Sequence, residues 1–117
     1  MAYVDGFLLA VPKDRIEDYK RIARQAEPVF REFGATEYVE CIGDDVPDGT
    51  LTSFPRAVQA TDDETVVLSW VVYPSKEVRD AANAKIMKDE RLAEVMKDMP
   101  VDGKRMIMGG FEPFTGL

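Results

Sequence analysis

The pattern of apolar positions along the chain predicts four strands. Each is a segment in which β-branched and aromatic residues are concentrated and which ends near a turn-forming residue. The segments are 3–11, 36–42, 65–73 and 105–112. Two glutamates in the second segment, Glu37 and Glu40, are typical of a strand at the edge of a sheet. A short segment at 56–60 is separated from the strand at 65–73 by an acidic turn, which predicts a hairpin.

Apolar residues at helical spacing predict helices between these strands. Asp14 begins the first helix with an Asp-x-x-Glu capping pattern, and Gly34 stands where its C-cap is expected. Pro28 is expected to kink this helix or to open a second segment. Ser75 is a favourable N-cap for a second helix, and Asp89 for a short one that follows it. The order of elements is therefore strand, helix, strand, strand, helix, strand.

This order is a βαββαβ plan, which predicts an α+β protein with a ferredoxin-like antiparallel sheet. In that topology the first and third strands lie in the middle of the sheet, and they are the two most apolar segments of the chain. We find no internal repeat and no linker in the 117 residues, so a single domain spanning 1–117 is expected.

The third strand is apolar on both of its faces. Its alternating positions are Val66, Leu68, Trp70 and Val72 on one face, and Val67, Ser69, Val71 and Tyr73 on the other. Helices cover only one face of such a sheet, and a large exposed apolar face favours association. We therefore expect a homodimer in which two sheets face each other and form a dimeric α/β barrel. The alternative is that the loop 43–56 folds over the sheet and covers this face.

Composition removes several classes of chemistry. The chain has one cysteine, Cys41, and no histidine, which excludes an intrachain disulfide, a CxxC site and the histidine-dependent nucleophile and metal motifs. Acid–base chemistry would need a carboxylate, tyrosine, lysine or cysteine with a shifted pKa. The thiol of Cys41 has no basic neighbour in sequence and is expected to be buried and inert. The methionines at 87, 96, 99, 106 and 108 are expected to fill gaps in the core.

The net charge of the chain limits the classes of partner that it can bind. A formal charge of −7 argues against binding to nucleic acid or to an anionic membrane surface. The acidic loop with Asp44, Asp45 and Asp48 lacks the spacing of a calcium-binding loop and reads as a turn, so neither a metal nor another cofactor is expected. The chain has no apolar run of about 20 residues and no basic region typical of a secretory signal, so the expected compartment is the cytoplasm.

Several long stretches are characteristic of one family. The stretches YVDGFLLAVP, VEC followed by DDVPDG, SWVVYPSKEVRDAANAKIM and MPVDGKRMIMGGFEPF closely resemble the YbaA-like family of bacterial conserved hypothetical proteins, and the resemblance runs nearly end to end. It implies a dimeric α+β barrel of the ferredoxin-like type. It implies no established activity, because the family is a domain of unknown function. Dimeric α+β barrels more widely include cofactor-free monooxygenases and small-molecule isomerases, which is an analogy of fold alone.

The alternation of side chains along the strands predicts one candidate site. If Trp70 packs beneath the helices, Ser69 and Tyr73 point into the space between the two sheets, where Asp5 and Glu40 join them from neighbouring strands. A carboxylate in an apolar, partly enclosed site has its pKa raised, which would supply a general acid or base without histidine. The alternative is that both carboxylates pair with Lys or Arg, or lie in water at the barrel rim.

Two arginines are candidates for holding a carboxylate ligand at the mouth of a cavity. They are Arg56, in the loop region, and Arg79, in the first turn of the second helix. Ion pairs with the many acidic residues of the chain are the alternative. In the last strand, Gly109 and Gly110 fall on opposite faces, so that one can admit a helix or a cavity and the other a partner sheet. A β-bulge is the competing explanation for this pair.

Two classes of function remain open. The first is a small-molecule-binding or cofactor-free enzymatic dimeric barrel, with the ligand between the sheet and the helices. The second is a non-enzymatic dimer that serves as an interaction or stress-related module. A closed, polar-lined pocket of several hundred Å³ would favour the first class. A core filled by Trp70, Phe7 and the methionines would favour the second.

Overall fold

The computed structural model describes all 117 residues and contains one four-stranded antiparallel sheet. The strands are β1 (Tyr3–Pro12), β2 (Glu37–Ile42), β3 (Glu64–Tyr73) and β4 (Ile107–Phe111). Their order in the sheet is β2-β3-β1-β4. The two most apolar strands are therefore central, and β2 and β4 form the edges. This arrangement confirms the α+β, ferredoxin-like prediction.

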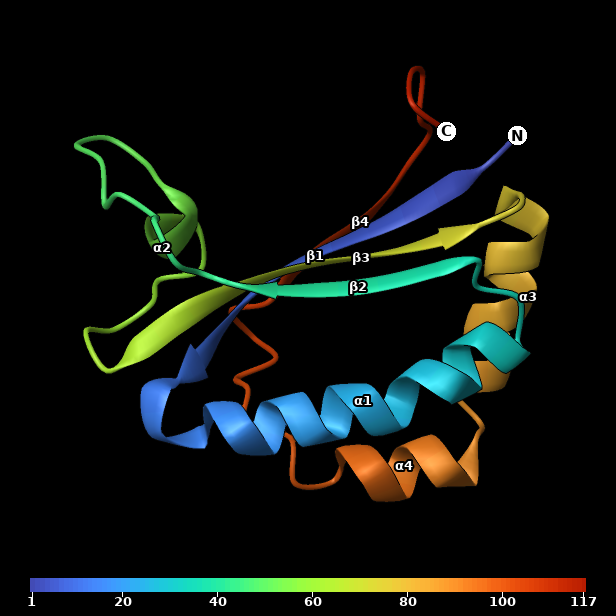
Figure 1. Cartoon of the computed structure of the whole chain (residues 1–117), viewed down its shortest axis with the longest axis horizontal. Coiled ribbons are helices and arrows are strands. Elements are labelled where there is room, and N and C mark those ends of the chain that lie inside the picture. The colour runs from blue at the N-terminus through green and yellow to red at the C-terminus, as the bar shows by residue number, and fades with distance from the viewer.

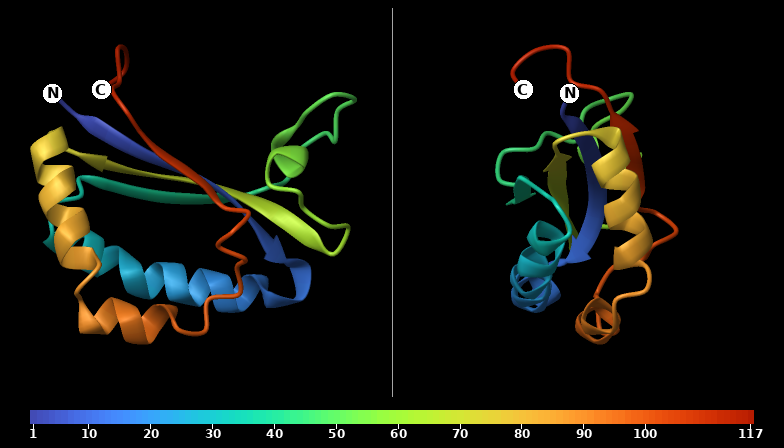
Figure 2. Two further views of the ribbon diagram at one scale, coloured as in Figure 1. Left: turned by 180° about the vertical axis from the view of Figure 1, so that it is seen from behind. Right: turned by 90° about the vertical axis from the view of Figure 1, so that its right-hand side faces the viewer.

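The helices lie mainly on one side of this sheet. They are α1 (Ile16–Glu32), α2 (Phe54–Ala57), α3 (Lys76–Ile86) and α4 (Glu90–Met96), with a 3-10 turn at Lys13–Arg15 before α1. Figure 1 shows α1 and α4 side by side beneath the sheet and α3 descending from the end of β3, whereas the short α2 lies on the opposite side. The end-on view in Figure 2 shows the same separation. None of these helices is both long and apolar enough to cross a membrane.

Alternate residues of the central strands pack against the helices. Leu9 and Val67 form one core cluster with Tyr19 and Ala23 of α1. Val71 and Tyr73 belong to a second cluster that includes Ala82 of α3. A Leu or Val side chain contributes roughly 1.5–3 kcal/mol when it is fully buried. The odd-numbered positions of β1 and β3 therefore face the helices.

Trp70 does not pack beneath the helices as we had supposed. It lies opposite Gly6 of β1 and Val39 of β2, on the face of the sheet that the long helices leave uncovered. Consequently Ser69 and Tyr73 point toward the helices and not toward a partner sheet. The alternation was predicted correctly, but both faces of β3 are apolar, so hydrophobicity could not decide which face the helices cover.

Helix capping follows the sequence at three predicted positions. The side chains of Ser75 and Asp89 accept hydrogen bonds from the backbone N–H groups of Val78 and Leu92, each at 3.1 Å. Gly34 follows the end of α1 with a φ of +119°, and a side chain there would lie 2.7 Å from Val78. Only glycine fits that turn without strain.

The start and the interior of α1 differ from the prediction. Asp14 lies in the 3-10 turn, and no side chain caps the helix, which begins at Ile16. Pro28 lies inside one continuous helix and does not open a second segment. Both Pro28 and Arg24, whose carbonyl loses its usual partner, are exposed, so water can satisfy that carbonyl.

The segment 56–60 does not form a strand. Ser53 accepts a hydrogen bond from the backbone N–H of Arg56 at 3.1 Å, and with a proline in the first turn this makes the short helix α2. The chain then brings Val58, which is 1% exposed, onto Ala10 and Val66. The loop and α2 therefore cover one end of the outer face of the sheet. The rest of that face stays open and exposes Leu68, Ile107 and Phe111.

Gly109 and Gly110 lie on opposite faces of β4, as their positions predicted. They pair in unbroken register with Gly6 and Asp5 of β1, so no bulge separates them. A side chain at Gly110 would overlap the hydroxyl of Tyr3 and the guanidinium of Arg79, whereas one at Gly109 would meet only Phe111. Arg79 of α3 therefore approaches Gly110 from the helix side, whereas Gly109 lies on the outer face of the sheet.

Candidate functional site

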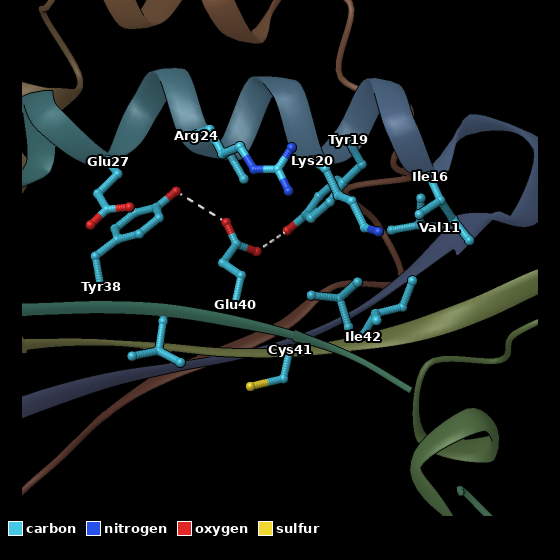
Figure 3. Close-up of a pocket in the computed structure, with 13 residues that line it drawn as sticks. Val11, Ile16, Tyr19, Lys20, Arg24, Glu27, Tyr38, Glu40, Cys41 and Ile42 are labelled. Atoms are coloured by element: carbon cyan, nitrogen blue, oxygen red, sulfur yellow. Dashed lines mark hydrogen bonds between the residues drawn. The ribbon is translucent and has the colours of Figure 1, made fainter. Parts of the chain in front are cut away.

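The most unusual polar group of the protein is a glutamate between the sheet and α1. Glu40 lies opposite Ser69 in the pairing of β2 with β3, and its carboxylate points toward α1. One of its oxygens accepts a hydrogen bond from the hydroxyl of Tyr19, and the other accepts one from Tyr38 at 3.0 Å. Figure 3 shows the carboxylate held between the two phenols.

The local structure explains how both tyrosines reach this carboxylate. Tyr19 belongs to the buried stripe of α1 and is 5% exposed. Tyr38 precedes Glu40 by two residues on β2 and therefore shares its face of the sheet. The ring of Tyr38 packs against that of Phe30 on α1, with centroids 5.2 Å apart. The hydroxyls are thus placed by packing and not by flexible side chains.

The surroundings raise the pKa of Glu40 above its ordinary value. Burial is the main cause, and the hydrogen bonds from Tyr19 and Tyr38 oppose it in part. The pKa values of both phenols are also raised, by burial and by the nearby Glu40 charge, so they stay protonated donors. A carboxyl whose pKa is raised by apolar surroundings is a stronger base than an ordinary glutamate and can accept a proton from a bound molecule and return it.

Glu40 borders a cavity of about 310 Å³ between the sheet, α1 and the segment that precedes β4. Of its 15 lining residues 12 are hydrophobic, so the cavity suits a molecule that is largely apolar. The hydroxyl of Ser69 also lines it and makes no hydrogen bond within the chain. We call this space the inner cavity.

Three of the five methionines expected in the core, Met96, Met99 and Met106, pack against core clusters as predicted, whereas Met87 and Met108 do not. Met96, Met99 and Met106 line the inner cavity and leave it open. Met87 and Met108 are 86% and 62% exposed. Flexible thioether side chains around a cavity can adapt to the shape of a ligand.

A second hollow, which we call the outer groove, lies between α1 and the edge strand β2. Its volume is about 380 Å³, and Figure 3 shows Lys20 and Arg24 projecting over it from α1. Cys41 also borders this groove and is exposed, which contradicts the expectation of a buried thiol. Its position at an edge strand, facing away from the helices, explains this exposure.

Asp5 and Arg79 form a separate polar cluster at the other end of the sheet. Arg79 of α3 brings its Nε within 3.2 Å of an Asp5 oxygen, and its Nη2 donates to the hydroxyl of Tyr3 at 3.1 Å. Its guanidinium also stacks on the Tyr3 ring, with the central carbon 4.6 Å from the ring centroid. Its Nη1 donates to Asp80 at 2.9 Å. The contacts with Asp5 and Tyr3 fasten α3 to β1.

Two groups in this cluster have perturbed pKa values. Burial raises the pKa of Asp5, although the charge of Arg79 opposes the change. Tyr73 is fully buried, its hydroxyl has no hydrogen-bond partner, and burial with the nearby Asp5 charge raises its pKa to about 12. The side chains of Asp5, Tyr73 and Arg79 border neither the inner cavity nor the outer groove. The cluster therefore reads as a structural brace.

The six residues singled out from the sequence are thus divided among three places. Glu40 and Ser69 meet at the inner cavity, whereas Asp5, Tyr73 and Arg79 form the brace. Arg56 lies in α2, where its guanidinium donates to the backbone carbonyl and the side chain of Asp48 at 2.7 and 3.2 Å. Asp5 and Arg79 pair with each other, and Arg56 pairs with Asp48. These three residues therefore follow the alternative in which they form ion pairs within the chain. No group of three or more His, Cys, Asp or Glu side chains is placed to hold a metal ion.

Sequence reasoning missed the two tyrosines that hold Glu40. Tyr38 could have been found, because it lies two positions before Glu40 on the same strand face. Tyr19 was assigned to the apolar stripe of the first helix, where its ring does lie. Nothing in the sequence showed that its hydroxyl would meet a carboxylate from the edge of the sheet.

The fold and this site define a class of protein: a ferredoxin-like α+β chain with a largely apolar cavity between its sheet and its helices. Solved structures share the fold. A NIPSNAP family protein from Agrobacterium tumefaciens superimposes with a TM-score of 0.60 at 13% identity, covering 97% of this chain and 93% of its own. SnoaB, described as a cofactor-independent oxygenase from Streptomyces nogalater, gives 0.61 at 14% identity, with 99% and 96% covered. A dimeric ferredoxin-like protein from an uncultured marine organism gives 0.61 at 10% identity, with 98% and 97% covered.

These identities are so low that the likeness shows the fold alone. The sequence itself is more specific. Residues 2–103 match the family described as "Protein of unknown function (DUF1428)", and the chain belongs to this family. It is 58% identical over 112 residues to the protein called "Uncharacterized protein YbaA" in Escherichia coli K12 and in Shigella flexneri. In both cases 96% of each chain is covered. The family resemblance found in the sequence is confirmed.

Proposed function

We propose that the protein binds a small, largely apolar molecule in the inner cavity, with Glu40 as the group that holds or removes a proton of that molecule. The observation that carries this proposal is the partly buried Glu40 carboxylate, bonded to Tyr19 and Tyr38 at the wall of a largely apolar cavity. Burying a charged group is costly, and a chain that gains nothing from it would be more stable with an apolar residue there.

The proton chemistry follows from the environment of Glu40. A ligand O–H, or a C–H next to a carbonyl, that approaches this carboxylate can pass its proton to it, leaving the electron pair on the ligand and a neutral carboxyl on the protein. Tyr19 and Tyr38 stay protonated and orient the carboxylate through this exchange. The chain needs no cofactor for this step, and the fold likeness to SnoaB, described as a cofactor-independent oxygenase, supports that chemistry by analogy.

The alternative is a non-enzymatic interaction or stress-related module. A core filled by Phe7 and the methionines would have favoured it, but Phe7, Met96, Met99 and Met106 line an open cavity of about 310 Å³. Trp70, the other residue named for such a core, lies on the outer face. The size of the cavity therefore supports the small-molecule proposal, whereas its largely apolar lining differs from the polar lining expected from the sequence.

N-phenylnaphthylamine, an uncharged aromatic probe whose fluorescence rises in apolar sites, tests the proposal. We expect it to bind the purified protein, and we expect Ser69→Leu, which fills the inner cavity, to weaken binding about tenfold or more. Ala81→Leu adds similar volume at an exposed position of α3 and serves as the control. Equal binding by all three proteins, with their melting temperatures intact, would refute the inner cavity as the binding site.

We further propose that the whole chain 1–117 folds as one domain and pairs with a second copy through the outer face of the sheet. That face exposes Leu68, Ile107 and Phe111, with Trp70 between them. Its central positions carry no charge, so two copies can meet without desolvating an ion. Residues of the loop and α2 cover only one end. The structural neighbour described as dimeric and ferredoxin-like supports this pairing.

We also propose that the protein works in the cytoplasm, without nucleic acid or membrane as a partner. An exposed and unpaired thiol at Cys41 is compatible with a reducing compartment. The net charge of −7 supports the exclusion of polyanionic partners.

A further inference from the structure

The outer groove and the inner cavity are neighbouring spaces. Five residues border both of them: Tyr19, Ala23, Tyr38, Val39 and Glu40. The hydrogen-bonded bridge from Tyr19 through Glu40 to Tyr38 therefore lies in the wall that the two spaces share (Figure 3). A molecule that lies in the groove is already next to the carboxylate of the inner cavity.

The outer groove differs from the inner cavity in charge. Lys20 and Arg24, one turn apart on α1, project over it (Figure 3). Glu27 also borders the groove, but its carboxylate is held by Arg31 at 2.8 Å. Lys20 reaches Glu17 at 3.3 Å in an exposed pair that costs little to exchange.

Arg24 is the exception among the arginines of this acidic chain. The other seven each lie within 4 Å of a carboxylate: Arg15, Arg21, Arg31, Arg56, Arg79, Arg91 and Arg105. Arg24 has no such partner and donates no side-chain hydrogen bond. In a protein with 22 acidic and 15 basic residues, an unpaired arginine at the mouth of an apolar groove is a specific feature. A guanidinium presents a fork of donors that matches a carboxylate or sulfonate.

We propose that the ligand is an amphipathic anion whose acidic group binds Arg24, with Lys20 beside it, while its apolar body passes the Tyr19–Glu40–Tyr38 bridge into the inner cavity. This inference rests on the proposed function and adds the class of ligand. In this proposal the negative charge of the ligand is balanced by Arg24 and Lys20 of α1. The end that reaches Glu40 is the uncharged, proton-bearing one.

Two probes that differ by one group test this assignment. Anilinonaphthalenesulfonate carries the aromatic body of N-phenylnaphthylamine together with a sulfonate. We expect the sulfonate to improve binding to the wild-type protein about tenfold, the size of one charge-assisted contact. Arg24→Gln should remove this gain and leave the affinity for N-phenylnaphthylamine unchanged. Arg21→Gln is the matched control on the same helix, because Arg21 pairs with Asp18 at 3.5 Å.

The outcomes separate this inference from the proposed function. If N-phenylnaphthylamine binds in a Ser69-dependent way but Arg24→Gln leaves the affinity for the sulfonate probe unchanged, the anion site is refuted and the inner cavity stands. If only the sulfonate probe binds, and Arg24→Gln abolishes that binding, the anion site is supported and the inner cavity is refuted. If neither probe binds, both are overturned. Arg24 is exposed, so its substitution is not expected to impair folding.

Discussion

Glu40 of β2 and Ser69 of β3 lie directly opposite each other in the sheet, and both side chains border the inner cavity beneath α1. This relationship places an ionisable group and an unpaired hydroxyl side by side in largely apolar surroundings. It also distinguishes the cavity from the brace of Asp5 and Arg79, whose charges satisfy each other. The two clusters are therefore expected to respond differently to substitution and to pH.

Removing the charge of Glu40 should stabilise the protein. Because burial raises the pKa of Glu40, the charged carboxyl costs folding free energy at every pH above its folded pKa. The cost disappears as the pH falls below the unfolded value of about 4.3, where the group is neutral in both states. Glu40→Gln should raise the melting temperature at pH 7.5 by roughly 4–8 °C, equivalent to about 1 kcal/mol.

Thermal unfolding followed by circular dichroism from pH 4 to pH 8 measures this effect. The advantage of Glu40→Gln should shrink as the pH is lowered, whereas Glu37→Gln on the same strand should change little at any pH. A destabilised Glu40→Gln variant at pH 7.5 would show that the hydrogen bonds to Tyr19 and Tyr38 outweigh the burial of charge.

Glu64 should behave with the opposite sign. Its two oxygens accept hydrogen bonds from Arg105 at 2.7 and 2.8 Å, and these bonds lower its pKa to about 2. A lowered pKa stabilises the fold above the unfolded value of about 4.3, and this contribution is lost as the pH falls toward 2. Glu64→Gln should therefore cost on the order of 1–2 kcal/mol at pH 7.

Urea unfolding at several pH values tests this contribution. The difference between Glu64→Gln and the wild type should narrow steadily between pH 5 and pH 3. Glu90→Gln, at an exposed position of α4, is the control and should match the wild type throughout. If the difference in unfolding free energy stays constant with pH, the ionised form of Glu64 does not stabilise the fold.

The outer face of the sheet should lose its ability to pair when it carries a charge. Leu68 is 42% exposed at the middle of this face, and a glutamate there would be buried without a partner in the homodimer. Leu68→Glu is expected to convert the dimer to monomer at micromolar concentration, as measured by analytical ultracentrifugation. Met87→Glu, on an exposed residue beyond α3, should stay dimeric. A monomeric wild-type protein would rule out the proposed pairing.

The adjacent glycines of β4 offer a matched pair of substitutions. A methyl group at Gly110 overlaps Tyr3 and Arg79, so Gly110→Ala must displace the brace and should cost about 2–4 kcal/mol of unfolding free energy. Gly109→Ala meets only the Phe111 ring at 3.6 Å and should change stability by less than about 0.5 kcal/mol. Chemical denaturation of both variants makes the comparison. Equal costs would contradict the assignment of Gly110 to the helix side.

Much of the fold could be predicted from the apolar pattern. The four strands, the central position of the two most apolar ones and the caps at Ser75 and Asp89 all follow from local rules that the structure obeys. The strand predicted at 56–60 overlaps the end of the helix at Phe54–Ala57, although Ser53 and the proline after Phe54 are a helix-start signal. The apolar character of Val58 reflects its packing onto the sheet and not a strand.

The site could be predicted only in part. Parity placed Ser69, Tyr73 and Asp5 on one face of the sheet, but it could not say which face meets the helices, because β3 is apolar on both. Sequence spacing also carries no information on which carboxylate finds an arginine. Asp5 meets Arg79 and Glu40 meets two phenols, and this difference depends on how α3 and α1 dock onto the sheet.

Native mass spectrometry of the protein purified from its own host shows whether the inner cavity holds a molecule. We expect the wild-type protein to retain a small molecule, together with the mass of a dimer, and Ser69→Leu to lose the molecule. Wild-type protein that carries no small molecule and binds no N-phenylnaphthylamine, or equal retention by Ser69→Leu, would contradict the proposal that the inner cavity is a binding site.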